Sequence, residues 1–338
     1  MKRLFIVTGA AGFLGNNIVL ELSKNKDNEI RVLLLPNESS LPLEGFNVII
    51  YRGDVTNKDS LLPLFDVDKN YPLYVIHCAG IVSVKSKYNK KLYDVNVKGT
   101  KNIADLTLER KGKLIYVSSV HALNKANMNS VIKETSRYDI KSVYGHYAKS
   151  KVMASNYVLD LVNKSDLNAS IVLPSGLIGP RDYGKSHLTE LIIDYASSKL
   201  KAIVKGGYDF SDVRDVAKGI INAAYIGKKG ESYILSNKYI KISELIEEVD
   251  KIIKRKKKIK ILPMTLAKLT APIAELYYLV RNKPPLYTSF SLRTIDEKVY
   301  FSNEKARSEL AYKTRSLEET IKDTINWLIE QNKITLKS

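Results

Sequence analysis

The chain has 338 residues, enough for one large core and a smaller lobe, and its hydrophobic share of 44% is that of a globular α/β protein. The single cysteine, Cys78, excludes a disulfide within the chain and fits a reducing compartment, so a cytoplasmic location is expected. The formal net charge of +18 could attract anions, but the one basic run, 254–258, has no interleaved aromatics, so no nucleic-acid partner is expected.

The first half of the chain alternates between two patterns. Strand-like apolar runs occupy 3–8, 30–35, 47–51, 73–77, 113–118 and 168–173, and helical patterns lie near 13–24, 57–66, 88–109 and 142–163. Such alternation predicts parallel strands joined by right-handed crossovers, with helices on both faces. The expected fold is therefore α/β, a Rossmann-type doubly wound parallel sheet, over residues 1–173. Ligands bind such sheets at the carboxyl ends of the strands.

The regularity weakens after Pro174, and residues 174–338 are expected to form a smaller substrate-binding lobe. Strands are predicted near 201–204 and 231–235, and helices near 213–226, 243–254, 264–280, 303–310 and 317–330. Elements near 201–235 are expected to return to the first domain. The stretch 261–280 is as long as a membrane span, but Pro263, Lys268, Pro272 and Glu275 interrupt it. Two amphipathic helices lining a pocket are predicted there, and no stable membrane insertion.

A glycine-rich turn, Thr8 to Gly15, follows the first strand and opens the first helix. Gly9 allows a sharp turn, Gly12 allows the backbone to approach a pyrophosphate, and Gly15 allows close helix–strand packing. The helix N-terminus offers unpaired N–H groups and a partial positive charge to phosphates. This context predicts a dinucleotide site.

The spacing Gly-x-x-Gly-x-x-Gly, with Thr8 ahead of it, resembles the short-chain dehydrogenase/reductase family, and further matches follow in that family's order. They are Gly53-Asp54-Val55, His77-Cys78-Ala79-Gly80, Asn96, Ser118-Ser119, Tyr147 with Lys151, and Pro174. The length and second half resemble the family's extended branch, the epimerase/dehydratase superfamily. The resemblance implies NAD or NADP as cofactor and a homodimer through the helices near 88–109 and 142–163. The cofactor residues it implies are Gly9, Ala11, Gly12, Phe13, Leu14, Gly15, Leu35, Asp54, Val55, Cys78, Ala79, Gly80, Ser118, Tyr147, Lys151 and Pro174.

Tyr147 and Lys151 are four residues apart on a helical pattern and share one face. A neighbouring ammonium would lower the tyrosine pKa toward neutrality and make Tyr147 a general acid and base. Ser119 would donate a hydrogen bond to the substrate oxygen, and is preferred to Ser118 because the family places its hydroxyl just past the strand end. Asn96 either holds a water for proton relay or caps local backbone groups. His121 and His146 are expected to be bystanders, since no metal-ligand spacing surrounds them. Cys78 is expected to serve packing at a buried strand end and not to take part in the chemistry.

The end of the second strand, Leu33 to Glu38, carries neither an aspartate nor an arginine. Relatives read the adenosine ribose here, with an acidic residue for NAD and an arginine for NADP. Leu35 stands at the expected arginine position, so weak discrimination between NAD and NADP is predicted.

Three features bear on the substrate. Val120-His121 follow Ser119 where dehydratases of the family carry Asp-Glu, and Tyr208 stands where a diphosphate-clamping arginine is expected, although Arg181 or Arg214 could substitute. The segment 262–287 is rich in Leu, Ala, Tyr and Pro, which suits an apolar substrate but equally suits ordinary packing.

The favoured prediction is a reductase or dehydrogenase acting on a small or medium apolar carbonyl or alcohol, similar to dihydroflavonol reductases and 3β-hydroxysteroid dehydrogenases. The alternatives are a sugar or sugar-nucleotide epimerase and a non-catalytic dinucleotide sensor.

Overall fold

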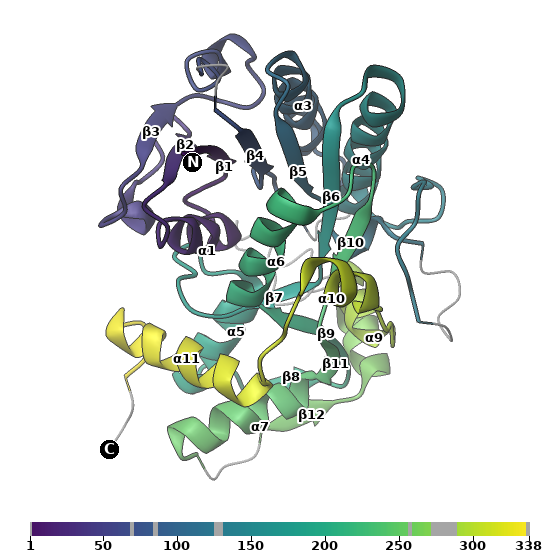
Figure 1. Cartoon of the computed structure of the whole chain (residues 1–338). Helices are drawn as coiled ribbons and strands as arrows, with labels where there is room; N and C mark the ends of the chain where they lie inside the picture. Colours follow the sequence, from purple (N-terminus) through teal and green to yellow (C-terminus); the bar gives the residue numbers. More distant parts are fainter. Residues whose placement is uncertain are drawn as a thin grey trace.

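A computed structural model describes residues 2–67, 71–83, 87–124, 131–255, 259–271 and 289–335. Its central sheet has seven parallel strands in the order β10-β6-β5-β4-β1-β2-β3 (Figure 1). The strands are β1 (Arg3–Thr8), β2 (Asn28–Leu34), β3 (Ile49–Arg52), β4 (Leu73–His77), β5 (Lys113–Val117), β6 (Asn168–Pro174) and β10 (Ser232–Leu235). The predicted doubly wound sheet is confirmed.

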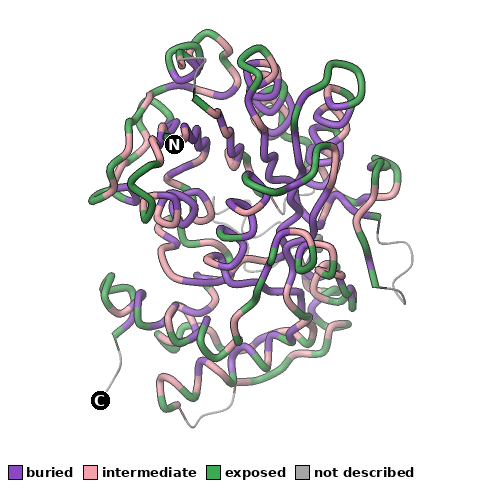
Figure 2. The backbone as a smooth tube through the Cα atoms, viewed as in Figure 1, coloured by how far each residue is buried: buried purple, intermediate pink, exposed green. Residues whose placement is uncertain are grey.

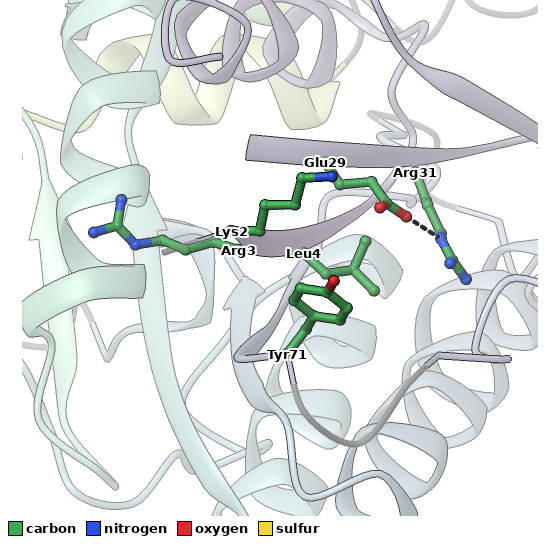
Figure 3. Close-up of a pocket in the computed structure, with 6 residues that line it drawn as sticks. All are labelled: Lys2, Arg3, Leu4, Glu29, Arg31 and Tyr71. Carbon is green, nitrogen blue, oxygen red and sulfur yellow. Dashed lines mark hydrogen bonds and ion pairs between the residues drawn. The ribbon is translucent and has the colours of Figure 1, made fainter. Parts of the chain in front are cut away.

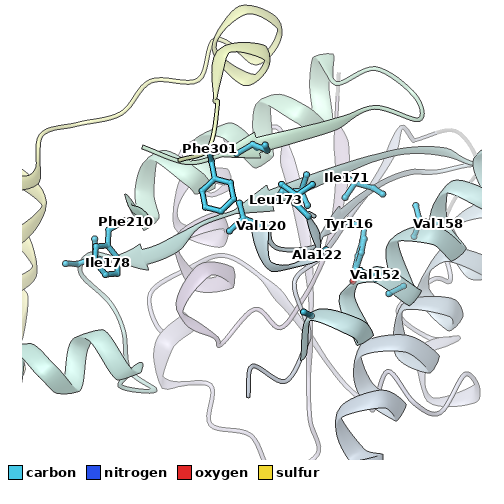
Figure 4. Packing of buried hydrophobic residues seen from close by; sticks show 14 of the residues in the cluster. Tyr116, Val120, Ala122, Val152, Val158, Ile171, Leu173, Ile178, Phe210 and Phe301 are labelled. Carbon is cyan, nitrogen blue, oxygen red and sulfur yellow. The ribbon is translucent and has the colours of Figure 1, made fainter. Parts of the chain in front are cut away.

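Both faces of the sheet are covered by helices, which explains why its strands are apolar on both sides. Phe5 and Val7 of β1 belong to one core, which includes α1 (Phe13–Leu22) and α6 (Val213–Ile226). Leu4 and Ile6 belong to the other core, which includes α3 (Thr100–Glu109) and α4 (His146–Ser165). Figure 2 shows the resulting buried centre, and Figure 4 shows part of the second core, around Tyr116 and Val120.

The second half of the chain contributes elements both to the first domain and to a smaller lobe. It contributes α6 and β10 to the first domain, and α10 (Glu304–Leu310) packs against both. The remainder forms a small sheet of β11 (Lys238–Lys241), β9 (Gly207–Asp212) and β7 (Gly176–Ile178), and a pair of β12 (Lys260–Leu262) with β8 (Ala202–Val204). Helices α5 (His187–Ala196), α7 (Ile242–Ile253), α9 (Ser289–Asp296) and α11 (Leu317–Glu330) accompany them. Of the elements expected to return, β8 does not, because it pairs with β12.

One predicted helix is wrong. Residues 57–66 form only a 3-10 turn, η2 (Asp59–Leu61), followed by further turns. Pro63 lacks an N–H and its ring would clash with a helical backbone. Ser60 also bonds the carbonyls of Asp54 and Asn57, which holds the segment in a turn.

The helix predicted at 88–109 is present but irregular. It consists of α2 (Lys90–Tyr93), a π-helical segment η3 (Asp94–Gly99) and α3. Short π-helical insertions widen a helix locally and are frequent at functional sites. Here the widened segment contains Asn96.

Ion pairs around the buried carboxylate of Asp212 tie the start of α6 to α11. Asp212, whose side chain is 1% exposed, accepts hydrogen bonds from Arg214 at 2.7 Å and Arg315 at 3.0 Å. Arg214 also reaches Asp323 of α11 at 2.5 Å. Burial alone would raise the pKa of Asp212, but the two guanidinium groups outweigh it and lower the pKa.

The predicted helix at 264–280 is described only in part. Residues 264–271 are helical, whereas 272–288 lie outside the described residues, as do 256–258 of the basic run. Within the described ranges, none of the helices has the length and apolar character needed to cross a bilayer.

Candidate active site

Nearly all the candidate residues lie at one edge of the central sheet. The glycine turn follows β1, Leu35 follows β2, Asp54 follows β3, Cys78 to Gly80 follow β4, Ser118 and Ser119 follow β5, and Pro174 ends β6. The strands are parallel, so their carboxyl ends meet along this edge. The order 3-2-1-4-5-6 reverses direction at β1, and ligands bind such sheets where the order reverses.

The glycine turn is closely packed against the end of β4. Gly9 has a φ of +66°, and a Cβ on it would lie 2.8 Å from the backbone nitrogen of Ala79. A Cβ on Gly15 would lie 2.0 Å from the carbonyl oxygen of Gly9. Gly12 caps α1 without a side-chain hydrogen bond, so the first N–H groups of the helix have no side-chain cap. The turn therefore has free helix N–H groups for a pyrophosphate, and its tight packing leaves no room for side chains at Gly9 and Gly15.

A buried histidine fixes the strand ends beside this turn. His77 Nδ1 lies 2.7 Å from Thr8 Oγ1, and His77 Nε2 lies 3.1 Å from Thr100 Oγ1. Thr100 gives its proton to the carbonyl oxygen of Asn96, so it accepts from His77 Nε2–H. Burial lowers the pKa of His77 to about 3, with Lys151 contributing, so the imidazole is neutral. His77 therefore links β1, β4 and α3 as a structural group.

The end of β2 holds an arginine that the sequence interpretation did not consider. Leu35 is 49% exposed, and its N–H donates to the Glu38 carboxylate at 2.9 Å. Arg52, paired with Leu34 across β2 and β3, donates through Nη1 to the carbonyl oxygens of Leu35 and Glu38. The region expected to bind the adenosine ribose therefore contains one acidic side chain, Glu38, and one basic side chain, Arg52. Both form hydrogen bonds with the backbone of the loop that follows β2.

Asp54 also bonds locally. Its Oδ1 accepts from the backbone N–H and the hydroxyl of Thr56, both at 2.8 Å. Asn102 of α3 donates to the carbonyl oxygen of Val55 at 2.8 Å. These bonds fix the loop after β3 against α3 and keep it at the edge of the sheet.

The structure brings Ser119, and not Ser118, to Tyr147. The Ser119 side chain opposes the rise in the pKa of Tyr147 that burial causes, and its Oγ accepts the His121 N–H at 3.2 Å. The Ser118 hydroxyl lies 2.9 Å from that of Ser155 inside α4. Both Ser119 and Tyr147 are buried, at 7% and 9% exposure, so a reacting oxygen between them would be largely withdrawn from water.

Lys151 lies one turn after Tyr147 on α4, as predicted, but its amine is engaged elsewhere. Nζ donates to the carbonyl oxygen of Val117 at 2.8 Å, and burial lowers the Lys151 pKa to about 8. The pKa of Tyr147 is raised by burial, with the Ser119 side chain opposing. The expected lowering of the tyrosine pKa is therefore not observed, because burial outweighs any effect of the ammonium.

Asn96 faces the same corner and its side chain is fully bonded. Nδ2 donates to the Ile81 carbonyl and to Ser150 Oγ, each at 3.0 Å, and Oδ1 accepts the Ile81 N–H at 2.7 Å. Of the two roles left open for Asn96, this pattern matches the capping of backbone groups. Gly80 lies between Asn96 and Lys151, since a Cβ there would be 3.3 Å and 3.5 Å from their polar atoms. Burial raises the pKa of the Cys78 thiol to about 12, which leaves it unreactive.

Two residues near Tyr147 were undervalued from the sequence. The His121 ring meets the Tyr147 ring edge-on, with centroids 5.9 Å apart, and stacks on Tyr208 at 5.7 Å and 14°. The Tyr208 hydroxyl lies 3.1 Å from His121 Nε2. The sequence could have indicated His121, because it lies two residues after Ser119. It could not have indicated Tyr208, because β9 reaches the site only through the tertiary fold.

Neither arginine that could replace a diphosphate clamp is placed for it. Arg181 donates to Asn16 Oδ1 and to the Pro42 carbonyl, at 3.1 and 2.8 Å. Arg214 is held by Asp212 and Asp323 in the ion pairs described above. A pocket of about 60 Å³ around Arg3 and Tyr71 lies at the opposite edge of the sheet, at the starts of β1 and β2, with room only for a few waters (Figure 3).

Comparison with known proteins places this site in a family. The model for the NAD dependent epimerase/dehydratase family matches residues 5–236. Sterol demethylase protein B of Methylococcus capsulatus is 25% identical over 97% of this chain and 99% of its own length. A putative dihydroflavonol 4-reductase of Synechocystis is 25% identical over 97% and 95%. The crystal structure of a protein designated gox2253 has a TM-score of 0.84 and 29% identity, covering 99% of this chain and all of its own. With its parallel sheet, glycine turn and strand-end residues, the chain belongs to the NAD dependent epimerase/dehydratase family, an extended branch of the short-chain dehydrogenases/reductases.

Proposed function

We propose that this enzyme transfers a hydride between NAD(P) and the carbonyl or alcohol carbon of a small or medium apolar substrate. The observation that carries the proposal is the placement of Ser119 and Tyr147, both buried and both in contact with His121, beside Lys151 at the carboxyl edge of the sheet. The bound nicotinamide supplies or accepts the hydride. The residues of this chain hold the substrate oxygen and move its proton.

Tyr147 is the proton donor in reduction and the acceptor in oxidation. Ser119 receives the His121 N–H at its oxygen, so its own proton is available to Tyr147 or to the substrate oxygen. Lys151, with a pKa near 8, carries a proton for part of its population at neutral to mildly basic pH. Its amine can exchange the Val117 carbonyl for the cofactor ribose and then support the charge on Tyr147.

The apolar substrate is inferred from the groups around the site. A buried diphosphate without a cationic partner costs several kcal/mol of binding. Tyr208 stands at the expected clamp position, and Arg181 and Arg214 already have partners. The names of two relatives, a sterol demethylase protein and a dihydroflavonol reductase, agree with a ring-containing apolar substrate.

Epimerisation of a sugar or sugar nucleotide is the second candidate, because the family includes epimerases by name. It needs the same transfer of hydride and proton, so Ser119, Tyr147 and Lys151 do not exclude it. A sensor that binds a dinucleotide without catalysis would not need these three residues together.

The test combines two measurements on the purified protein. Oxidation of NADH and NADPH is followed with aromatic and aliphatic aldehydes and ketones, and calorimetry measures UDP-glucose, UDP-galactose and dTDP-glucose binding to the NAD-loaded enzyme. We expect turnover of carbonyls and no sugar-nucleotide binding in the micromolar range. Micromolar binding of a sugar nucleotide with no carbonyl turned over would replace the reductase by the epimerase.

The remaining expectations accompany this proposal. The division into two domains, 1–173 and 174–338, stays a prediction. So do the cytoplasmic location and the homodimer through the helices near 88–109 and 142–163. Gel filtration with light scattering tests the homodimer directly.

A further inference from the structure

Three aromatic rings form a row that starts in the lobe and ends at Tyr147. Tyr208 belongs to β9, whose neighbours in the small sheet are β11 and β7. His121 belongs to the 3-10 turn η4 (Val120–Ala122) that follows Ser119, and Tyr147 is the second residue of α4. The row is therefore built from three segments far apart in the sequence.

Each contact in the row fixes the next ring. The Tyr208 hydroxyl is within hydrogen-bond distance of His121 Nε2, at 3.1 Å, and the two rings are nearly parallel. Phe210 meets Tyr208 edge-on, with ring centroids 5.9 Å apart. A Cβ on Gly176 would lie 3.0 Å from Tyr208 Cδ1, so the backbone of β7 closes one side of the ring.

The same turn orients the Ser119 hydroxyl. The backbone N–H of His121 donates to Ser119 Oγ, while its ring touches Tyr147. Residue 121 thus contacts both Ser119 and Tyr147, the first through its backbone and the second through its ring. The backbone contact survives any substitution except proline, so the contribution of the ring can be measured separately.

We propose that Tyr208 and His121 are the substrate-selecting residues of this site, and that they favour planar, apolar carbonyl compounds over saturated ones of equal size. The inference rests on the proposed reductase function. A planar conjugated group packs on aromatic faces with an offset or edge-on geometry that a puckered ring cannot adopt. Neither Tyr208 nor His121 is the arginine that a diphosphate would pair with, which agrees with the missing clamp.

The test uses a matched pair of probes, acetophenone and cyclohexyl methyl ketone, which differ in ring planarity and little in size. We measure the ratio of kcat/KM for the two ketones with NADH or NADPH. The wild type should prefer acetophenone. Tyr208→Leu and His121→Ala should each lower the ratio by about threefold to tenfold, the range one aromatic contact supplies, with the NADH dissociation constant unchanged. Tyr208→Phe, which keeps the ring, should keep most of the preference.

Tyr225→Leu is the matched control, because its ring packs with Phe5 and Tyr74, away from Tyr147. It should leave the ratio unchanged. Thermal stabilisation of the NADH complex by each ketone gives a second reading that needs no turnover. If Tyr208→Leu and His121→Ala lower kcat/KM equally for both ketones, or leave the ratio alone, the inference is wrong. If acetophenone stabilises the NADH complex of the wild type more than cyclohexyl methyl ketone does, and Tyr208→Leu and His121→Ala abolish that difference, but no carbonyl is reduced, the inference holds and the reductase function is wrong.

Discussion

The amine of Lys151 on α4 donates a hydrogen bond to the carbonyl oxygen of Val117, the last residue of β5, at 2.8 Å. This contact ties the helix that carries Tyr147 to the strand that leads into Ser119. It also buries an ammonium group, and burial lowers the Lys151 pKa to about 8.

That shift predicts a dependence of stability on pH. Between pH 8 and 10 the unfolded chain holds the Lys151 proton more than the folded chain does, so the free energy of unfolding rises with pH through this group. Lys151→Met removes this contribution. The free energy of unfolding of the wild type minus that of the mutant should therefore increase as pH rises from 8 to 10. Urea unfolding of both proteins measures the difference. The buried tyrosines titrate alike in both and cancel. A constant difference across this range would show that Lys151 keeps its ordinary pKa.

Tyr147→Phe should lower kcat by a factor of about 10² to 10⁴, the usual contribution of acid–base catalysis. Only the transferable proton of the hydroxyl group is removed, so the NADH dissociation constant should stay close to that of the wild type. Tyr144→Phe is the control, since Tyr144 is 55% exposed and has Ala148 four residues on. A Tyr147→Phe enzyme that keeps more than about a tenth of the wild-type rate would exclude Tyr147 as the proton donor.

Gly9→Ala should weaken NADH binding and destabilise the fold by more than the cost of a positive φ. An alanine in the left-handed region costs about 1–2 kcal/mol, and at Gly9 its Cβ would also meet Ala79 at 2.8 Å. Gly45→Ala separates the two effects, because Gly45 has a φ of +83° and an added Cβ there meets no atom within 4 Å. Chemical unfolding and NADH titration of both variants check this. Equal losses in the two would mean that the close approach of the turn to β4 is unimportant.

Leu35→Arg should shift preference toward NADPH. The side chain of residue 35 is 49% exposed beside the Glu38 carboxylate and the Arg52 guanidinium. A second guanidinium there offers a bidentate partner for a 2′-phosphate. The ratio of kcat/KM for NADPH and NADH measures the shift, with Leu62→Arg, at a similarly exposed leucine, as control. An unchanged ratio would place the ribose elsewhere, and Arg52→Ala would then be the variant to examine.

The sequence by itself determined the central sheet and the candidate residues at its edge. Apolar runs of strand length alternating with helical patterns have few packing solutions, and parallel strands bring all their carboxyl ends to one edge. Gly9, Ser119, Tyr147 and Lys151 could therefore be placed together without coordinates. Pro63 shows where a local pattern misled, since a helical period at 57–66 contains a residue that ends a helix.

Tertiary structure decided what surrounds those residues. Tyr208 lies more than eighty positions from His121 in sequence, and only the pairing of β9 with β7 and β11 brings the two rings together. The partners of Arg181 and Arg214 likewise come from distant segments, including Pro42 and Asp323. The pKa of Tyr147 depends on how deeply α4 is buried, a quantity that no spacing of residues encodes. Burial and long-range contacts are sums over the whole fold, and for that reason the chemistry at the end of β5 could be located from the sequence but not described from it.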